Sequence, residues 1–302
     1  MYLGQRVGGR NRGDPRTSGG QKRTPALLSD HPRRGPRACY AGFWLRRGPP
    51  LLNTAQRQPY EGLAAIYDHV MRHVDYAEWA AHVWALFARF GHQPRQTIDL
   101  ACGTGSTLFE LHRGGKQVSG ADASAAMLEV ARQRLVQAGV EIPLFHRDLR
   151  QLAGLGPFDT ALCLYDSFNY LLTPEDLDLA LSEISSILLA GNFFIFDICT
   201  EKNSLRHFCD MRDEERGPGF IYRRHSFYDR EERLQFNRFH IRFDNQETEL
   251  EECHMQRIYP VDEVIARIEA SPFELRGSFD GFTFARGSEA SERIHFVLQR
   301  PG

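Results

Sequence analysis

The sequence predicts an α/β fold: a doubly wound, mostly parallel sheet of seven strands, with an inserted antiparallel meander of three strands. Three observations favour it. Apolar strand-like runs alternate with helical patterns between residues 97 and 197, as in parallel sheets covered by helices on both faces. Glycines stand where the first of these strands turns into a helix. After Gly219, apolar and polar residues alternate, which is typical of antiparallel strands with one buried face.

The composition permits a packed core and excludes several classes of protein. Hydrophobic residues make up 42% of the 302 residues and charged residues 25%, so a largely disordered chain is excluded. No stretch of 18 apolar residues occurs, so we expect no membrane span. The 6 cysteines show neither CxxC pairs nor zinc-ligand spacing, so we expect free thiols in a reducing cytoplasm and no metal site.

The net charge of -2 conceals an uneven distribution. Residues 1–58 hold 12 basic and 2 acidic residues, a net of +10, whereas residues 59–302 hold 25 basic and 37 acidic residues, a net of -12. The acidic body argues against a nucleic-acid partner. Residues 1–58 also contain 9 glycines and 6 prolines and show no apolar periodicity. We therefore predict a disordered basic tail over 1–58 and a single domain over 59–302.

The predicted elements follow the chain in order. Apolar residues three and four apart predict a short helix over residues 60–71, and Asp75 opens a second helix that Gly91 ends. Apolar runs predict five strands, at 97–102, 117–122, 143–148, 158–165 and 192–197. The helices between them are predicted at 106–112, 124–135 and 174–189.

The C-terminal part is predicted to hold the insertion and to complete the sheet. Alternating strands at 220–228, 234–243 and 249–258 form the antiparallel meander, 220–258. A helix follows from Pro260 to Ala270. Two last strands, at 273–284 and 293–300, bring the main sheet to seven.

The strongest chemical signal is the run Asp99-Leu100-Ala101-Cys102-Gly103-Thr104-Gly105. Glycines at a strand-to-helix turn let the backbone approach a ligand, and the next helix presents free N–H groups. Asp122 ends the next predicted strand, and a carboxylate there can accept hydrogen bonds from both ribose hydroxyls of a nucleoside. The alternative is that Asp122 only caps the helix that begins at Ser124. Leu108 stands where the third glycine of a GxGxxG fingerprint would be, which disfavours a nucleotide-dependent dehydrogenase.

Residues 60–302 resemble a class I S-adenosylmethionine-dependent methyltransferase, which has a Rossmann-like fold. The resemblance rests on the run at 99–105, on residues 120–128, on 148–149 and on 159–170. The turn before the fifth strand departs from the family pattern at two positions, Ala190 and Asn192. The helix with Tyr67 and Asp68, the segment 165–170 and the meander resemble a narrower group. That group contains small bacterial methyltransferases of uncertain substrate and aminosugar N,N-dimethyltransferases.

The resemblance implies S-adenosylmethionine as the cofactor. Residues of the run 99–105, which begins with Asp99, and of the next strand would hold it. Gly103 and Gly105 would lie under its methionine moiety, and the Ala101 carbonyl would take its ammonium group. Asp122 would hold the ribose. Tyr67 would reach the methionine carboxylate, or it would be an ordinary packing aromatic.

The resemblance also implies residues around the adenine. Ala123 and Met127 would pack on the ring, although a methionine on a helix face is also a common core residue. Asp148 would accept from the adenine amino group, and the Leu149 N–H would donate to the ring. The alternative for Asp148 is a cap of the next turn.

The acceptor side has a weaker signal. Methyl transfer from a sulfonium is an in-line displacement in which positioning supplies much of the rate, so the catalytic residues stay unassigned. The candidates are Tyr165, Asp166 and Asn169, at the carboxyl end of the fourth strand, where open α/β sheets bind ligands. The aromatic residues of 220–258 indicate that the meander roofs an acceptor site or makes a dimer contact, with Tyr67 and Trp79 as the opposite lid.

The sequence therefore predicts a cytoplasmic enzyme, monomer or homodimer, that methylates a nitrogen or oxygen of a small molecule. Nucleic-acid and membrane partners are not expected. The alternatives are a non-catalytic S-adenosylmethionine-binding module, which predicts a closed acceptor pocket, and an RNA methyltransferase, which would need a basic channel.

Overall fold

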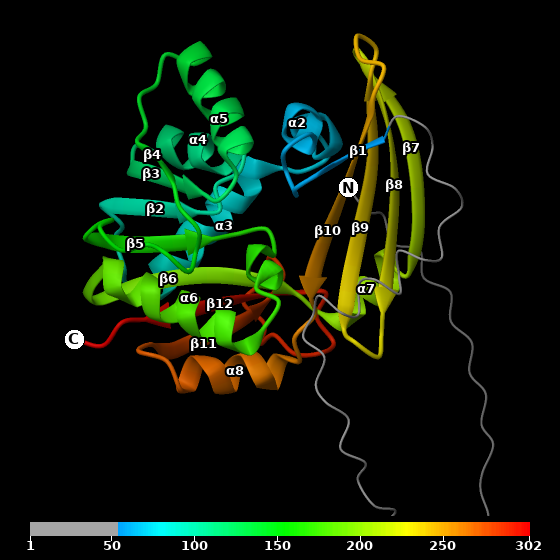
Figure 1. The fold of residues 1–302 in the computed structure, drawn as a ribbon. Helices are drawn as coiled ribbons and strands as arrows, with labels where there is room; N and C mark the ends of the chain where they lie inside the picture. The colour runs from blue at the N-terminus through cyan, green and yellow to red at the C-terminus, as the bar shows by residue number, and fades with distance from the viewer. Residues whose placement is uncertain (1–53) are drawn as a thin grey trace, which may run out of the picture. The chain divides into compact units, whose positions relative to one another are not determined.

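The computed structural model describes residues 54–302, so the predicted tail lies outside the described residues except for its last five. Its centre is a sheet of seven strands in the order β11-β12-β6-β5-β2-β3-β4 (Figure 1). The strands are β2 Gln96–Leu100, β3 Gln117–Asp122, β4 Leu144–His146, β5 Phe158–Cys163, β6 Leu188–Cys199, β11 Glu274–Asp280 and β12 Arg293–Gln299. β12 runs antiparallel to both its neighbours and the other pairs are parallel, so the predicted mostly parallel sheet is confirmed.

Helices cover both faces of this seven-stranded sheet. α6 (Pro174–Ile187) and α8 (Val261–Glu269) pack on one face, around Phe194, Phe196 and Ile98. α3 (Tyr76–Arg89) and α4 (Ser106–Arg113) pack on the other, around Leu162 and Ile195. Burial on both faces explains why the strands read as continuous apolar runs in the sequence.

Side-chain caps begin the helices where the sequence places them. The Asp75 carboxylate accepts the Glu78 N–H at 2.9 Å, and the Ser124 hydroxyl accepts the Met127 N–H at 3.2 Å at the start of α5 (Ala125–Gln137). Thr173 accepts the Asp176 N–H at 3.1 Å, with Pro174 in the first turn of α6. Each such cap contributes about 1 kcal/mol to the stability of its helix.

A second sheet holds the insertion, and its size corrects the prediction. It has five strands in the order β1-β10-β9-β8-β7, not three. The three predicted strands are present as β8 Phe220–Asp229, β9 Leu234–Phe243 and β10 Glu249–Arg257. The two additional strands lie at its edges: β7 Asp210–Gly217, and β1 Thr54–Arg57, which pairs parallel with β10. β1 therefore lies within the predicted tail, before the predicted boundary at residue 59.

The edge strands carry no apolar pattern because their pairing rests on backbone hydrogen bonds. β7 reads DMRDEERG and β1 reads TAQR, and neither has a side chain in the buried class. Charged residues are the usual composition of an exposed sheet edge.

Four short elements complete the described part of the chain around the sheets. The predicted helix over 60–71 is a 3₁₀ turn, η1 Leu63–Ile66, followed by one α turn, α2 Tyr67–Val70. A 3₁₀ turn, η2 Ser167–Tyr170, follows β5. The helix α7, Glu201–His207, lies in a stretch that the sequence left unassigned. Over residues 54–302, none of the helices has the length and apolar character needed to span a membrane.

Candidate functional site

The predicted glycine loop lies at the carboxyl end of β2. Gly103 and Gly105 have φ of +57° and +76°, a region that glycine enters without steric cost. A Cβ built on Gly103 would meet nothing within 4 Å, so the loop faces open space there, whereas a Cβ on Gly105 would lie 3.3 Å from the Ala131 Cβ. The Cys102 N–H donates to the Ala121 carbonyl at 3.0 Å, which fixes the loop against β3. The loop is therefore a rigid backbone surface open to a ligand.

Asp122 connects this loop to the start of α5. One carboxylate oxygen accepts the Gly103 N–H at 2.8 Å, and the other accepts the Ser124 N–H at 2.7 Å. The structure thus shows the capping role at Ser124, and it also places Asp122 against the glycine loop. A carboxylate has about four acceptor positions, so it can still accept ribose hydroxyls.

Two buried carboxylates make this end of the sheet suited to a cationic ligand. Asp99 is 2% exposed, and its burial together with the charge of Asp122 raises its pKa to about 8. Burial also raises the pKa of Asp122. A positive charge bound beside these two groups would stabilise their ionised forms. The ammonium and sulfonium groups of S-adenosylmethionine are such charges, so the residues fit the implied cofactor.

Residues with strained backbone conformations lie around the glycine loop and the carboxyl end of β5. Among the described residues, five other than glycine have positive φ, and four of them surround this site: Tyr60, Ala101, Tyr165 and Asp166. Side-chain-bearing residues in this region cost about 1–3 kcal/mol each and concentrate at functional sites. Tyr165 and Asp166 follow β5, as predicted for the acceptor-side wall.

The N-terminal segment, residues 60–71, is fastened to the glycine loop. On α2, the Asp68 carboxylate accepts the Thr104 hydroxyl at 2.7 Å and forms an ion pair with Arg134 of α5. Arg134 also donates to the Thr104 carbonyl at 3.0 Å. The Ser124 hydroxyl donates to the Tyr60 carbonyl at 3.2 Å. These contacts make the segment a lid over the loop.

The same segment is fastened to the five-stranded sheet through Glu252 of β10. This carboxylate is fully buried and accepts the N–H groups of Tyr60 at 2.8 Å and Leu63 at 2.9 Å, and also that of Gly62. His254, two residues along the strand, bonds to it at 3.1 Å. Burial would raise the pKa of Glu252, but these hydrogen bonds hold it below its usual 4.5. The lid therefore joins both sheets.

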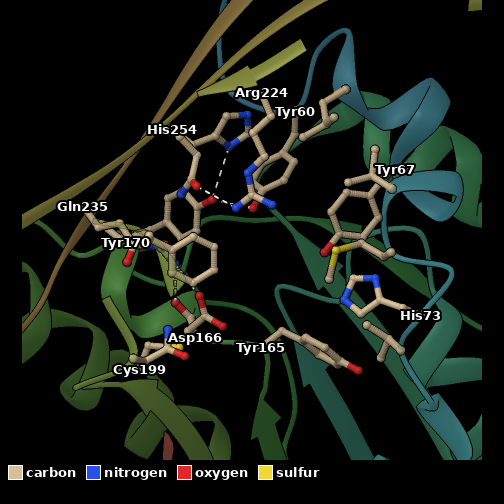
Figure 2. Close-up of a pocket in the computed structure, with 18 of the residues that line it drawn as sticks. Tyr60, Tyr67, His73, Tyr165, Asp166, Tyr170, Cys199, Arg224, Gln235 and His254 are labelled. Atoms are coloured by element: carbon tan, nitrogen blue, oxygen red, sulfur yellow. Dashed lines mark hydrogen bonds between the residues drawn. The ribbon is translucent and has the colours of Figure 1, made fainter. Parts of the chain in front are cut away.

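A cavity of about 410 Å³ lies between the lid, the ends of β5 and β6, and the inner face of the five-stranded sheet (Figure 2). Tyr67, Val70 and His73 line it from the lid side. The strand ends contribute Tyr165, Asp166 and Cys199. The residues from the five-stranded sheet are Arg224, Gln235, Asn237, Phe239, His254 and Gln256. Its volume is in the range of small-molecule sites.

Tyr165 and Trp79 form the floor of this cavity beside the lid. Their rings stack at 4.1 Å between centroids and 24° between planes. The Tyr165 hydroxyl is buried and has no hydrogen-bond partner among the described residues. Buried polar atoms are usually paired, so an orphan hydroxyl on a cavity wall indicates a polar group of a ligand.

Asp166 is held in place by two partners from different elements. Arg293 of β12 donates to one of its oxygens at 2.8 Å, and Gln256 of β10 donates to the other at 2.5 Å. Arg293 also pairs with Asp197, which is fully buried and whose pKa burial raises to about 6. Asp166 therefore has little freedom to turn toward an acceptor.

A chain of polar side chains from three elements lines the cavity: Tyr60 of the lid, Tyr170 of η2 and His254 of β10 (Figure 2). The Tyr60 and Tyr170 hydroxyls lie 2.6 Å apart, and the Tyr170 hydroxyl lies 3.2 Å from His254 Nδ1. Since the ionised Glu252 carboxylate can only accept, the hydrogen bond places the His254 proton on Nε2 and leaves Nδ1 to accept the Tyr170 hydroxyl. Burial raises the pKa of both tyrosines and lowers the pKa of His254, so the hydroxyls are protonated and the imidazole is neutral near pH 7.

Two residues after β5 differ in their relation to the cavity. Asn169 is not among its lining residues: its amide bonds to the Cys199 N–H, the Cys199 carbonyl and the Arg257 carbonyl, and a part in catalysis stays a prediction. Tyr170, which the sequence did not assign to the site, lines the cavity instead. The 3₁₀ turn of η2 causes the exchange, because neighbouring residues there point in directions that a strand-end reading does not anticipate.

The adenine-side residues lie beside one another at the ends of β3 and β4. Met127 is 2% exposed, and Ala123 and Asp148 line the same shallow groove. Arg150 bonds to both carboxylate oxygens of Asp148 at 2.8 Å and lowers its pKa. Leu149 packs against the core. The turn-cap alternative for Asp148 is thus present, and its bond to adenine stays a prediction.

Sequence reasoning missed Glu252 and His254. The missed signal was the spacing: residues two apart on a strand share a face, so a Glu-x-His pair places a carboxylate beside an imidazole.

Comparisons with known proteins relate the chain to methyltransferases. A family model described as "Methyltransferase domain" matches residues 98–191. The chain is 28% identical over 244 residues to "Putative methyltransferase YqeM" of Bacillus subtilis (strain 168), covering 80% of this chain and 97% of that protein. It is 33% identical over 141 residues to dTDP-3-amino-3,6-dideoxy-alpha-D-glucopyranose N,N-dimethyltransferase of Streptomyces fradiae, covering 46% of this chain and 54% of that one.

Among solved structures, an S-adenosylmethionine-dependent methyltransferase from Clostridium acetobutylicum ATCC 824 superposes with a TM-score of 0.69. It is 24% identical and covers 80% of this chain and 99% of its own. The fold, the glycine loop and these relatives together define a methyltransferase of class I. The chain is an S-adenosylmethionine-dependent methyltransferase, and S-adenosylmethionine is its cofactor.

Proposed function

We propose that this enzyme methylates a nitrogen or oxygen of a small polar molecule held in the cavity beneath the five-stranded sheet. The observation that carries the proposal is the cavity itself, which has polar walls from three parts of the chain. The lid connects it to the glycine loop, because Tyr67 lines the cavity and the neighbouring Asp68 accepts the Thr104 hydroxyl of the loop. A non-catalytic binding module predicts a closed acceptor pocket instead. Relatives named as dTDP-aminosugar N,N-dimethyltransferases, at 33% and 30% identity, support a small polar acceptor.

The residues of the glycine loop and its neighbours are proposed to bind the cofactor. S-adenosylmethionine supplies an electrophilic methyl group on a positively charged sulfur. Gly103 leaves room above the loop, Gly105 gives the loop its positive φ, and both lie under the methionine moiety. Asp122 holds the ribose. Tyr67 reaches the methionine carboxylate. Ala123, Met127, Asp148 and Leu149 surround the adenine. Ala101 offers its carbonyl to the ammonium group.

The lid and the polar chain complete the reaction site. The lid excludes water from above the loop, because Asp68 fastens it on one side and Glu252 on the other. A nitrogen acceptor must lose a proton when it is methylated. The neutral His254 imidazole can take that proton through the Tyr170 hydroxyl, with Glu252 stabilising the charged ring.

The five-stranded sheet is proposed to be the roof of the acceptor site, since six of its inner-face residues line the cavity. The alternative of a dimer contact concerns its other face. The aromatic pair Phe227–Phe236 stacks there, with ring centroids 4.6 Å apart. We propose a monomer or homodimer in the cytoplasm, in keeping with free thiols at Cys102, Cys163 and Cys199.

Asn203→Trp tests the assignment of the cavity. Asn203 of α7 lines the cavity at its side away from the glycine loop, so an indole there should fill the acceptor space and leave the cofactor residues untouched. We expect release of S-adenosylhomocysteine with an amine or hydroxyl acceptor to fall at least about tenfold. The dissociation constant of S-adenosylhomocysteine should stay within about twofold of wild type.

Leu205→Trp is the matched control, because Leu205 lies on the same helix, is 40% exposed and faces away from this cavity. It should keep wild-type turnover. Wild-type turnover in Asn203→Trp would show that the acceptor binds elsewhere.

A further inference from the structure

Arg224 is a charged side chain of the cavity wall that the proposed mechanism does not use. It lies on β8 between Tyr222 and Ser226, whose side chains are buried on the inner face of the sheet. Side chains two apart on a strand share a face, so Arg224 also points inward. It lines the cavity close to His254 and Tyr60 (Figure 2).

The Arg224 guanidinium is held in a fixed position by neutral groups. Its Cζ lies 5.2 Å from the ring centroid of Phe208 and 5.4 Å from that of Phe239. Nε donates to the Ser226 hydroxyl at 3.0 Å, and one terminal nitrogen donates to the Asn237 side-chain oxygen at 2.6 Å. These contacts use two of its five N–H donors, and they orient the group.

This cation has no counterion in the part of the chain that the structure describes. No described carboxylate forms an ion pair with Arg224. The acidic groups around it are already engaged. Asp166 bonds to Arg293 and Gln256, and Glu252 bonds to the lid and to His254. Asp213, across the strand pair on β7, accepts the Tyr222 hydroxyl at 3.2 Å.

A partly buried charge without a counterion is unfavourable unless a ligand supplies one. The other arginine on this wall shows the contrast, because Arg293 pairs with both Asp166 and Asp197. A guanidinium with free donors in a cavity matches the geometry of a carboxylate or a phosphate.

We propose that Arg224 binds an oxyanion, a carboxylate or a phosphate, carried by the methyl acceptor. The proposal rests on the proposed function, because it places this anion in the acceptor cavity. The enzyme would then select acceptors with a negative group at a fixed distance from the methylated atom, and would discriminate against their esters and amides.

The test is anion binding to the full chain saturated with S-adenosylhomocysteine, with inorganic phosphate and sodium acetate as probes. Binding is followed by calorimetry at constant ionic strength. We expect one of the two ions to bind the wild type. Arg224→Met should raise the dissociation constant of that ion at least about tenfold. Phosphate as the tighter ion indicates a phosphorylated acceptor, and acetate indicates a carboxylic acid. Arg224→Lys, which keeps the charge, should retain part of the affinity.

Arg223→Met is the matched control. Arg223 is the next residue on β8, points to the opposite face and pairs with Glu249 at 2.6 Å. The Arg223→Met variant should bind both ions with the affinity of the wild type. The proposal is overturned if neither ion binds the wild type, if Arg224→Met binds as tightly as the wild type, or if Arg223→Met weakens binding equally. The last result would place the ion in the outer groove, which Arg212, Arg223 and His225 line and which Arg224 also borders. Failure to bind S-adenosylhomocysteine would instead refute the proposed function.

Discussion

Replacing Glu252 by alanine is expected to destabilise the fold by about 3–5 kcal/mol, one of the largest effects of any single change. The substitution leaves the N–H groups of Tyr60, Gly62 and Leu63 without their acceptor in a buried site. It also leaves His254 Nε2 without its acceptor. For a domain of this size the loss corresponds to a melting temperature lower by roughly 6–20 °C, measurable by thermal or urea unfolding.

The pH dependence gives this prediction a second measurement. The pKa of Glu252 is depressed in the folded state, so its contribution to stability is present above its unfolded value of 4.5 and is lost as the pH falls through the folded value. The difference between wild type and Glu252→Ala should therefore shrink as the pH falls below about 4.5. Glu231→Ala, at an exposed position in the turn after β8, should be neutral. A melting temperature of Glu252→Ala within a degree of wild type would show that the lid is not held by this carboxylate.

Arg293→Leu is expected to destabilise the fold by a similar amount, about 3–5 kcal/mol. The substitution leaves the fully buried Asp197 carboxylate without its counterion and frees Asp166. The pKa of Asp197, already raised to about 6, should rise further. Since a raised pKa makes the ionised form unfavourable in the folded state, the penalty should be largest above neutral pH and should decrease as the pH falls toward the unfolded value of 3.8.

Urea unfolding of Arg293→Leu between pH 5 and pH 8 measures this dependence. Arg276→Leu is the control, because Arg276 of β11 is 45% exposed and lies 3.7 Å from Glu274, a surface pair of small effect. A destabilisation of Arg293→Leu that does not change with pH would mean that Asp197 is not the group left unpaired.

The seven-stranded sheet was predictable because each parallel strand is buried on both faces. In β2, for example, Ile98 and Leu100 are both fully buried, and such an apolar run is typical of a strand that is covered on both faces. The glycine loop was predictable for a similar reason, since the positive φ of Gly103 and Gly105 restricts the residue type.

The edges of the second sheet were not predictable from pattern. β1 and β7 gain their stability from backbone hydrogen bonds to β10 and β8, and their side chains carry no periodic signal. The β1–β10 pairing also joins residues 54 and 249, which no local pattern relates.

The acceptor wall was only partly predictable, because it forms where distant segments meet. Tyr165 and Asp166 line the cavity as the strand-end rule predicts. Arg224 and His254 enter it from the inner face of a sheet whose orientation depends on the Glu252 contacts with the lid. Alternation alone identifies which residues share a face and does not identify which face meets the cavity.

Calorimetric titration of S-adenosylhomocysteine into the full chain tests the central claim most directly. The account predicts a dissociation constant in the micromolar range, about -8 kcal/mol. Asp122→Ala should weaken binding by about 1.5–3 kcal/mol, because Asp122 would lose its bonds to the ribose. Asp159→Ala is the control. Asp159 also accepts two backbone N–H groups, from Arg95 and Gln96, but it lies near the amino end of β5, whereas the glycine loop follows the carboxyl end of β2. Its affinity should match that of the wild type. An unchanged affinity in folded Asp122→Ala, or no binding by the folded wild type, would contradict the account.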